Sequence, residues 1–224
     1  MNDMAEPTPT RVLIVEDHPM FRERIAELVE KEPDLQVCGE ADNIQSALTL
    51  LRASPAPHVV VLDISLRSGN GLELLKQMRA EGITTPVLVL SMHDDSLYAE
   101  RSLRAGAQGY ITKMEASAGV LAALRRVLAG EIHVSSKVAT QLIRAAASGR
   151  RDLAGIAQLT DRELEIFELI GRARSTREIA TRLRLGTSTV ETYRARIKTK
   201  LLLENTAQLT HEAVRWVQTL QSVA

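Results

Sequence analysis

The sequence predicts an α/β domain built on a five-stranded parallel sheet, followed by a smaller all-helical domain. Short aliphatic runs at residues 12–15, 59–62 and 87–90 are typical of strands buried on both faces of a parallel sheet, and helical patterns lie between them. The alternation ends near residue 131, and the patterns after residue 158 are all helical. These patterns indicate different fold classes, so we expect two domains in the 224 residues.

The elements of the first domain follow in chain order. Two weaker strands are expected near residues 36–39 and 109–112, which brings the number of strands to five. The apolar periodicity of the intervening segments predicts helices at residues 21–31, 44–52, 72–81, 96–105 and 118–129. Strands that alternate with helices in this way predict a doubly wound sheet, which we place at residues 1–134.

A linker that contains one helix is expected at residues 135–157. Its first part, residues 135–148, forms an amphipathic pattern with Val138, Leu142, Ile143 and Ala146 on one side. Residues 148–152 are small or charged and are typical of an exposed connection.

The second domain is expected at residues 158–224 and to contain four helices. At three of their starts a Ser or Thr is followed three residues later by Glu, the pattern of a capping box that satisfies free backbone amides. These pairs are Thr160 with Glu163, Ser175 with Glu178, and Ser188 with Glu191. The fourth helix, at residues 206–219, carries an apolar stripe that indicates either core packing or a dimer contact. The stripe consists of Leu209, Ala213, Trp216 and Val217.

Composition excludes several classes of protein. The single cysteine, Cys38, cannot form an internal disulfide or a cysteine-rich zinc site. No apolar run approaches the roughly 20 residues that cross a bilayer, and the first ten residues have no signal-peptide core. We therefore expect a cytoplasmic protein with no membrane contact.

Charge divides the chain although its net charge is zero. Residues 1–134 hold 13 Lys and Arg against 19 Asp and Glu, whereas residues 135–224 hold 15 against 9. A basic second half suits binding to a nucleic-acid backbone. The alternative is that the two halves attract each other.

Reactive side chains follow the strands of the first domain at the points where the strands end. Glu16 and Asp17 follow the first strand, Asp63 the third, Ser91 the fourth, and Lys113 the fifth. Because the carboxyl ends of parallel strands meet at one edge of a sheet, we expect these side chains to converge there. Clustered carboxylates repel one another unless a cation neutralises them, and oxygen ligands suit Mg²⁺. A carboxylate in such a site can accept a phosphoryl group.

These residues and their neighbours resemble the receiver domain of two-component response regulators. The similarity covers residues 10–130 and includes the segments 59–63, 90–95, 103–107 and 109–113. It implies a flavodoxin/CheY-like fold in which Asp63 is the phosphoacceptor and a sensor histidine kinase is the donor. It further implies roles for six other residues. Glu16, Asp17 and the backbone carbonyl of Ser65 hold Mg²⁺ together with Asp63, Lys113 pairs with the phosphoryl oxygens, and Ser91 and Tyr110 form the switch.

The first domain departs from the family pattern at two positions. Arg67 stands where many members have proline, four residues after the phosphoacceptor, and Met114 stands where many have proline after the lysine. Neither change removes a reactive group, so we still expect phosphorylation. The two changes leave the geometry of the switch undetermined by the resemblance.

The second domain contains a candidate recognition helix at residues 189–202. Val190, Ile197 and Leu201 form an apolar stripe, and the opposite face is small and polar, as in helices that enter the major groove. A helix at residues 176–183 and a turn containing Gly186 precede it, which makes a helix-turn-helix. Pairs of helices with a glycine turn also occur in bundles that bind no DNA. This geometry alone therefore does not distinguish a DNA-binding domain from an ordinary helical bundle.

Specific segments of the second domain resemble the LuxR/NarL-type DNA-binding domain. They lie at residues 159–165, 178–180, 188–191 and 200–201. The resemblance implies that the third helix of a four-helix domain reads the major groove. The candidate DNA-binding residues are Thr187, Ser188, Glu191, Thr192, Arg194, Ala195, Arg196, Lys198 and Thr199. This sequence departs from the family at three positions. Glu191 stands where the family usually has a basic residue, Tyr193 where it has histidine, and Leu202 where it has glycine.

Together these features predict a phosphorylation-controlled, DNA-binding transcription regulator that catalyses only its own phosphorylation and dephosphorylation. Its expected partners are the kinase, promoter DNA, a second copy of the chain after activation, and RNA polymerase. One alternative is a degenerate receiver that regulates without phosphate. Another is an aspartate-based phosphotransferase, but Ser65 occupies the place of its second acid. A nucleotide-dependent oxidoreductase is disfavoured, because residues 16–19 form no glycine-rich loop.

Overall fold

The computed structural model describes residues 8–66, 69–92, 96–147 and 155–222. The chain forms two compact units, Met1–Ala139 and Thr140–Ala224. The boundary between them lies inside helix α6 (Ser136–Ala147). The expected exposed connection at residues 148–152 lies outside the described residues.

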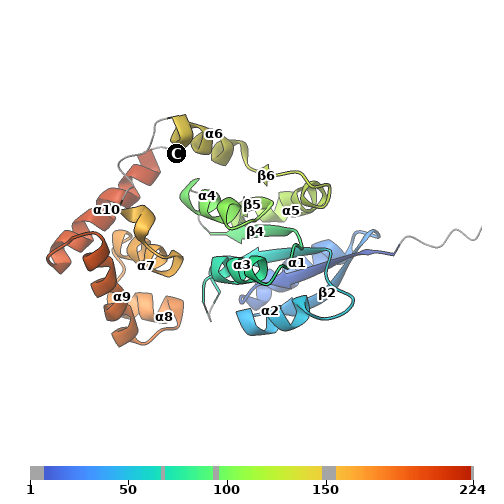
Figure 1. Cartoon of the computed structure of the whole chain (residues 1–224), viewed down its shortest axis with the longest axis horizontal. Coiled ribbons are helices and arrows are strands. Elements are labelled where there is room, and N and C mark those ends of the chain that lie inside the picture. Colours follow the sequence, from blue (N-terminus) through green and yellow to red (C-terminus); the bar gives the residue numbers. More distant parts are fainter. Residues whose placement is uncertain (1–7, 67–68, 93–95, 148–154, 223–224) are drawn as a thin grey trace, which may run out of the picture. The chain divides into compact units, whose positions relative to one another are not determined.

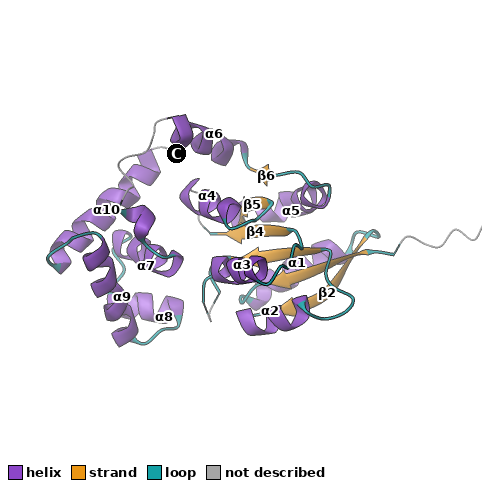
Figure 2. Ribbon diagram, viewed as in Figure 1, coloured by secondary structure: helices purple, strands orange, loops and turns teal. Residues whose placement is uncertain are grey.

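The first unit is an α/β fold around one parallel sheet (Figure 2). The strands are β1 (Thr10–Val15), β2 (Leu35–Ala41), β3 (Val59–Asp63), β4 (Val87–Ser91), β5 (Gly109–Thr112) and β6 (His133–Val134). Their order in the sheet is β2-β1-β3-β4-β5-β6, and all the pairs are parallel. The α/β fold class and the five expected strands are confirmed.

The sixth strand corrects the prediction of a five-stranded sheet. β6 is a two-residue strand in which His133 pairs with Gly109 and Val134 pairs with Tyr110. The backbone amide of His133 also donates to the carbonyl of Gln108 at 2.9 Å. Two residues are too few to show a strand periodicity, so only the pairing with β5 reveals this strand.

Five helices connect the strands. They are α1 (Pro19–Glu30), α2 (Ile44–Leu51), α3 (Gly71–Ala80), α4 (Ser96–Arg104) and α5 (Lys113–Leu128). Helix α5 begins five residues earlier than expected, because Thr112 and Glu115 form a capping box at its start. The backbone amide of Glu115 donates to Thr112 Oγ1 at 3.2 Å, and the amide of Thr112 donates to Glu115 Oε2 at 3.1 Å. Lys113 is therefore the first helical residue after β5, at the edge of the sheet.

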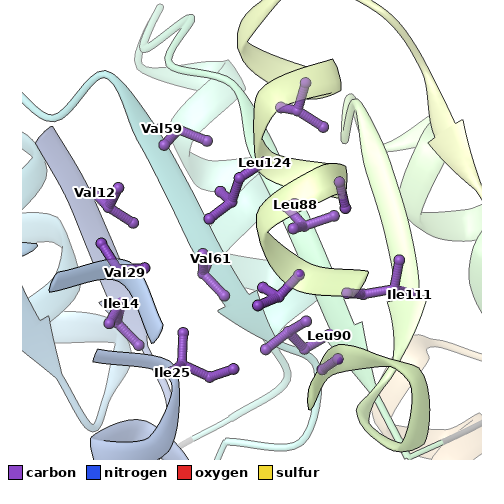
Figure 3. Close-up of a cluster of buried hydrophobic side chains, with 14 of the residues drawn as sticks. Val12, Ile14, Ile25, Val29, Val59, Val61, Leu88, Leu90, Ile111 and Leu124 are labelled. Atoms are coloured by element: carbon purple, nitrogen blue, oxygen red, sulfur yellow. The ribbon is translucent and has the colours of Figure 1, made fainter. Parts of the chain in front are cut away.

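One side of the sheet carries an aliphatic core beneath α1 and α5 (Figure 3). Val12, Ile14, Val61, Leu88 and Leu90 contribute from the strands, and all are almost completely buried. The helices contribute Ile25, Val29 and Leu124. Since burial of each such side chain contributes about 1.5–3 kcal/mol, this core holds the strand ends in fixed positions.

The second unit is helical, as the sequence predicts. After a short 3₁₀ turn, Ile156–Gln158, come α7 (Asp161–Gly171), α8 (Thr176–Leu183), α9 (Thr187–Lys200) and α10 (Thr206–Ser222) (Figure 1). The capping boxes expected at Thr160 with Glu163 and at Ser175 with Glu178 are both present.

The apolar stripe of α10 packs inside this unit. Leu209, Ala213, Trp216 and Val217 are all buried. The Trp216 and Phe167 ring centroids are 5.6 Å apart. A Cβ atom on Gly171 would lie 2.3 Å from the Ala213 carbonyl oxygen, so α7 and α10 approach closely there. The core-packing interpretation of the stripe is therefore confirmed.

The helix expected in the linker is present as α6. The prediction that its apolar residues share one side is partly wrong. Val138 is buried, whereas the side chain of Ile143 is 70% exposed. Residues 138 and 143 are separated by five positions, which places them on different faces of a helix. The side chain of Ala146 lies outside the described residues.

Leu202 offers a test of backbone strain in the turn between α9 and α10. Its φ is 57°, a left-handed conformation that favours glycine, and its side chain is 90% exposed. We expect Leu202→Gly to raise the free energy of unfolding of the helical unit by about 1 kcal/mol, because it relieves strain and loses no buried surface. Urea unfolding followed by Trp216 fluorescence measures this change. The matched control is Leu203→Gly, where the leucine is half-buried and φ is negative, so this variant should be less stable. A Leu202→Gly variant that is also less stable than wild type would refute the strain argument.

Candidate functional site

The first site lies where β1, β3, β4 and β5 end. Glu16 and Asp17 follow β1, Asp63 and Ser91 are the last residues of β3 and β4, and Lys113 follows β5. These four strands are neighbours in the parallel sheet, so their carboxyl ends share one edge. All five residues are buried, with Asp63 and Ser91 completely enclosed.

Lys113 joins the carboxylates into one cluster. Its Nζ lies 2.6 Å from Glu16 Oε2 and 2.8 Å from Asp63 Oδ2. The same ammonium lies 4.8 Å from the centroid of the Phe21 ring. Burial alone would lower the pKa of Lys113, but the Asp63 and Glu16 carboxylates outweigh burial and raise this pKa above its usual value. Lys113 therefore remains a cation at neutral pH and stays paired with both acids.

Asp63 is the acid whose protonation is most affected by its surroundings. Burial raises the pKa of Asp63 above its usual value, the Glu16 carboxylate adds to the rise, and Lys113 opposes it. The backbone amide of Ser65 donates to Asp63 Oδ1 at 3.2 Å. The carboxyl group is thus oriented from both sides, with Oδ1 toward the loop and Oδ2 toward Lys113.

A cation could bind beside Asp63. One ligand atom from each of Glu16, Asp17, His18 and Asp63 lies within 4.8 Å of the others. The cluster holds three carboxylates against one lysine, and this oxygen-rich donor set fits a hard divalent cation. Sequence reasoning missed His18, whose Nδ1 is 2.9 Å from Glu16 Oε1 and 2.8 Å from Asp17 Oδ1. The only signal for it was its position directly after the acidic pair.

The expected switch residues lie on the neighbouring strands β4 and β5, with Ser91 at the edge that carries the cluster. Tyr110 is completely buried on β5, and Ser91 is completely buried at the end of β4. Ser91 pairs with Thr112 in the register of β4 and β5, next to Lys113. Ser65 is half-buried two residues after Asp63. Arg67 lies outside the described residues, and the side chain of Met114 is 89% exposed.

The raised pKa of Asp63 predicts how stability depends on pH. The folded chain binds this proton more tightly than the unfolded chain does, so stability falls as pH rises from 3.8, the ordinary value, through the raised folded pKa. We expect Asp63→Asn to raise the free energy of unfolding at pH 7, because the variant avoids the cost of ionising a buried carboxyl group. The difference should shrink as pH falls toward 3.8. Metal-free melting curves at several pH values measure it, with the exposed Asp34→Asn as control. A less stable Asp63→Asn protein at pH 7 would contradict this prediction.

The second site is the exposed side of α9. Val190 and Ile197 are completely buried and Leu201 is half-buried, so the expected inward stripe is confirmed. The polar face carries seven exposed candidates, namely Thr187, Ser188, Glu191, Thr192, Ala195, Arg196 and Thr199. Ser188, Thr192 and Arg196 line a shallow hollow of about 340 Å³ with Thr189 and Tyr193. The Arg196 guanidinium lies over the Tyr193 ring, 5.8 Å from its centroid.

The prediction of a capping box at Ser188 and Glu191 is wrong. Helix α9 begins at Thr187, and its cap is Gly186, which makes no side-chain capping bond. Ser188 therefore lies inside the first turn. Glu191 instead accepts a hydrogen bond from Thr176 Oγ1 on α8 at 2.7 Å. Sequence reasoning missed this role of Thr176, since the partner comes from a different helix.

Two of the expected cations on α9 are less accessible than the sequence suggested. The side chain of Arg194 is only 12% exposed, and its Nη1 lies 3.4 Å from Thr176 Oγ1. Lys198 is half-buried. Arg196 is thus the exposed cation among the three predicted on this helix.

Two sequence families match the chain, one on each unit. The response regulator receiver domain matches residues 12–125, and the luxR family of bacterial regulatory proteins matches residues 157–213. The chain is a response regulator with a LuxR-type DNA-binding domain. The family predicted from the sequence is therefore confirmed, and the chain belongs to a family of transcription regulators.

Relatives cover almost the whole of this response regulator. The transcription regulator of virulence factors BvgA from Bordetella pertussis is 34% identical over 205 residues, which are 92% of this chain and 97% of BvgA. The response regulator UvrY from Escherichia coli K12 is 30% identical over 204 residues, covering 91% of this chain and 93% of UvrY. The solved structure of RcsB from Salmonella typhimurium covers 97% of this chain and 99% of RcsB, with a TM-score of 0.62 at 22% identity. This last likeness supports the fold. None of the described helices of the response regulator is long and apolar enough to cross a membrane.

Proposed function

We propose that this response regulator is controlled by phosphorylation of Asp63 by a sensor histidine kinase. The observation that carries the proposal is the buried Asp63, held between Lys113 Nζ at 2.8 Å and the acidic pair that follows β1. A carboxylate oxygen of Asp63 forms the new bond to phosphorus while the bond from phosphorus to the donor breaks. Lys113 is placed to compensate the charge on the transferring oxygens.

Glu16, Asp17, Asp63 and the backbone carbonyl of Ser65 are the groups that would hold Mg²⁺. Their oxygen donors fit this ion, and three buried carboxylates need more positive charge than Lys113 alone supplies. When bound, Mg²⁺ shields the approaching phosphoryl group from the carboxylates. His18, whose side chain is 65% exposed, contacts both Glu16 and Asp17 beside this donor set.

Phosphorylation would act through Ser91 and Tyr110. A phosphoryl group adds charge and acceptor oxygens at Asp63, and the Ser91 hydroxyl at the adjacent strand end is a donor for them. Movement of Ser91 at the end of β4 would shift the loop after this strand and alter the packing of Tyr110 on β5, which is completely buried in this structure. The resulting change of surface would promote dimerisation and promoter binding, since two linked half-site contacts bind DNA more tightly than one.

Intact-mass analysis after incubation with acetyl phosphate and Mg²⁺ tests the phosphorylation. Wild type should gain one phosphoryl group, and Asp63→Ala should gain none. Asp34→Asn, which removes an exposed acid on the same domain, should behave as wild type. A chelator should suppress the adduct. An adduct that persists in Asp63→Ala, or a wild-type chain that is modified by neither acetyl phosphate nor a kinase, would overturn the proposal.

The DNA-binding role of α9 is tested separately. We expect Thr192→Ala and Arg196→Ala each to weaken binding of the phosphorylated chain to DNA by about tenfold, because both side chains are exposed on the polar face. Arg215→Ala on α10, also an exposed arginine, is the matched control and should bind normally. Gel-shift titrations at constant salt measure the affinities, and phosphorylation of Asp63 verifies that the receiver stays folded. Unchanged binding of both variants would exclude this face.

A further inference from the structure

Three polar side chains connect α8 and α9, the two helices of the helix-turn-helix. Thr176 Oγ1 on α8 donates to Glu191 Oε1 on α9 at 2.7 Å. Arg194 Nη1 donates to the same Thr176 oxygen at 3.4 Å, and Arg194 Nε lies 3.7 Å from Glu191 Oε1. A hydroxyl can donate once and accept at the same time, so all three contacts are compatible. We call Thr176, Glu191 and Arg194 the α8–α9 latch.

The exposure of Arg194 shows that it is committed to these contacts. Its side chain is 12% exposed, whereas Arg196, two residues further along the same helix, is exposed. To bind a DNA phosphate, the Arg194 guanidinium would have to leave Thr176 and Glu191. That movement would break both contacts and expose a side chain that is now mostly buried, so it offsets part of the gain from a new phosphate contact.

Glu191 is committed in the same way although it is 59% exposed. It caps no helix, because Gly186 occupies the cap position of α9. Its Oε1 atom is occupied by Thr176 and faces the Arg194 guanidinium. The hydrogen bond from Thr176 fixes the orientation of the carboxyl group, and a carboxylate near DNA phosphates is repelled by them.

The apolar contacts of α9 do not by themselves fix its rotation. Val190 and Ile197 are its two completely buried side chains, and they lie seven residues apart on one stripe. Apolar burial is non-directional, so a helix held by one stripe can turn slightly about its axis. The hydrogen bond from Thr176 depends on direction and acts beside this stripe. It therefore restrains the first half of α9, while Lys200, which contacts Glu163 at 2.6 Å and the Gln158 carbonyl at 3.2 Å, restrains the end of the helix.

We propose that the α8–α9 latch orients the recognition helix, and that Glu191 and Arg194 are positioning residues that contact neither bases nor phosphates. The inference rests on the proposed DNA binding by α9 and refines it. It assigns direct contacts to Thr192, Arg196 and Thr199, and it removes Glu191 and Arg194 from the residues that touch DNA. It also explains why an acidic residue is tolerated at a position that is usually basic in the family.

Binding of the phosphorylated full chain to DNA duplexes, selected by wild type from a randomised pool, tests this proposal. We expect Thr176→Val and Glu191→Ala each to lower affinity by about tenfold. The double variant should be no weaker than either single variant, because both remove the same hydrogen bond. Glu191→Gln retains an acceptor for Thr176 and should recover most of the affinity. Thr210→Val on α10 is the matched control, since Thr210 Oγ1 bonds only to its own helix, at the Thr206 carbonyl.

Two readouts separate positioning from direct contact. In Glu191→Gln the hydrogen bond from Thr176 is retained, so the latch predicts that base preference stays unchanged in this variant. It also predicts that Arg194→Met weakens binding without changing the salt dependence, whereas loss of a phosphate contact would reduce the slope of log K against log salt by about 0.9. Circular dichroism verifies that the helices are retained.

Several results would overturn the inference. Normal binding by Thr176→Val would remove the latch, and an altered preference at one base pair in Glu191→Gln would make Glu191 a base-reading residue. A reduced salt slope in Arg194→Met would make Arg194 a phosphate contact. If wild type selects no DNA at all, the proposed function fails as well, which distinguishes that outcome from loss of the latch alone.

Discussion

Replacement of Gly71 by alanine is expected to destabilise the receiver domain by about 3 kcal/mol and to slow phosphorylation of Asp63 by about a hundredfold. Gly71 is the first residue of α3, and a Cβ atom there would lie 2.1 Å from the carbonyl oxygen of Asp63. The Gly71 amide also donates to the Ile64 carbonyl at 2.6 Å. Because the clash involves backbone and not a flexible side chain, the backbone at the phosphoacceptor must move.

Urea unfolding and the rate of adduct formation with acetyl phosphate measure the two effects of Gly71→Ala. Gly119→Ala is the matched control, since Gly119 lies within α5 and an added Cβ would meet nothing within 4 Å. This control should be slightly more stable than wild type, because alanine favours the helix, and should be phosphorylated at the normal rate. A Gly71→Ala protein with wild-type stability and a wild-type rate would show that the backbone position at Asp63 does not govern its phosphorylation.

Replacement of Lys113 by methionine is expected to slow phosphorylation by a hundredfold to a thousandfold, on the order found when a charge-stabilising donor is removed from an active site. The same variant should bind Mg²⁺ about tenfold more tightly, because the ammonium lies 2.6–2.8 Å from two carboxylates that would hold the ion. Opposite changes in metal affinity and reaction rate separate the role of Lys113 from a general loss of structure.

Calorimetric titration with Mg²⁺ and intact-mass kinetics test Lys113→Met. Lys31→Met, which removes an exposed lysine at the end of α1, is the control and should change neither quantity. Without metal, Lys113→Met should also be less stable than wild type, since it leaves Glu16 and Asp63 buried without their cation. Weaker Mg²⁺ binding by this variant would contradict the electrostatic argument.

The receiver site was largely predictable because of a simple geometric rule. Parallel strands end at one edge of the sheet, so Glu16, Asp63 and Lys113 could be expected to meet although they lie far apart in the chain. The start of α5 was also encoded, since Thr112 and Glu115 have the spacing of a capping box, but the prediction overlooked it. His18 was harder to identify, because a histidine beside acidic residues is common on loops without any role.

The helical domain was less predictable in its side-chain partners. Capping boxes at Thr160 and Ser175 formed as expected, since their bonds are local. The same spacing at Ser188 did not form one, because the chain is already helical at Thr187 and Glu191 reaches Thr176 on the preceding helix. A spacing rule describes contacts within one helix, and it cannot choose between a local partner and one from a neighbouring element.

By itself, the sequence determined the two domains, the order of strands and helices, and the residues gathered at the sheet edge. Periodicity and local hydrogen bonding act along the chain, and the carboxyl-end rule needs only that the strands be parallel. Only the tertiary structure decided that β6 joins the sheet, that His18 contacts the acidic pair, and that Arg194 is held beside Glu191 rather than exposed. Each of these depends on segments that meet through packing, and the distances between such segments are set by the folded core.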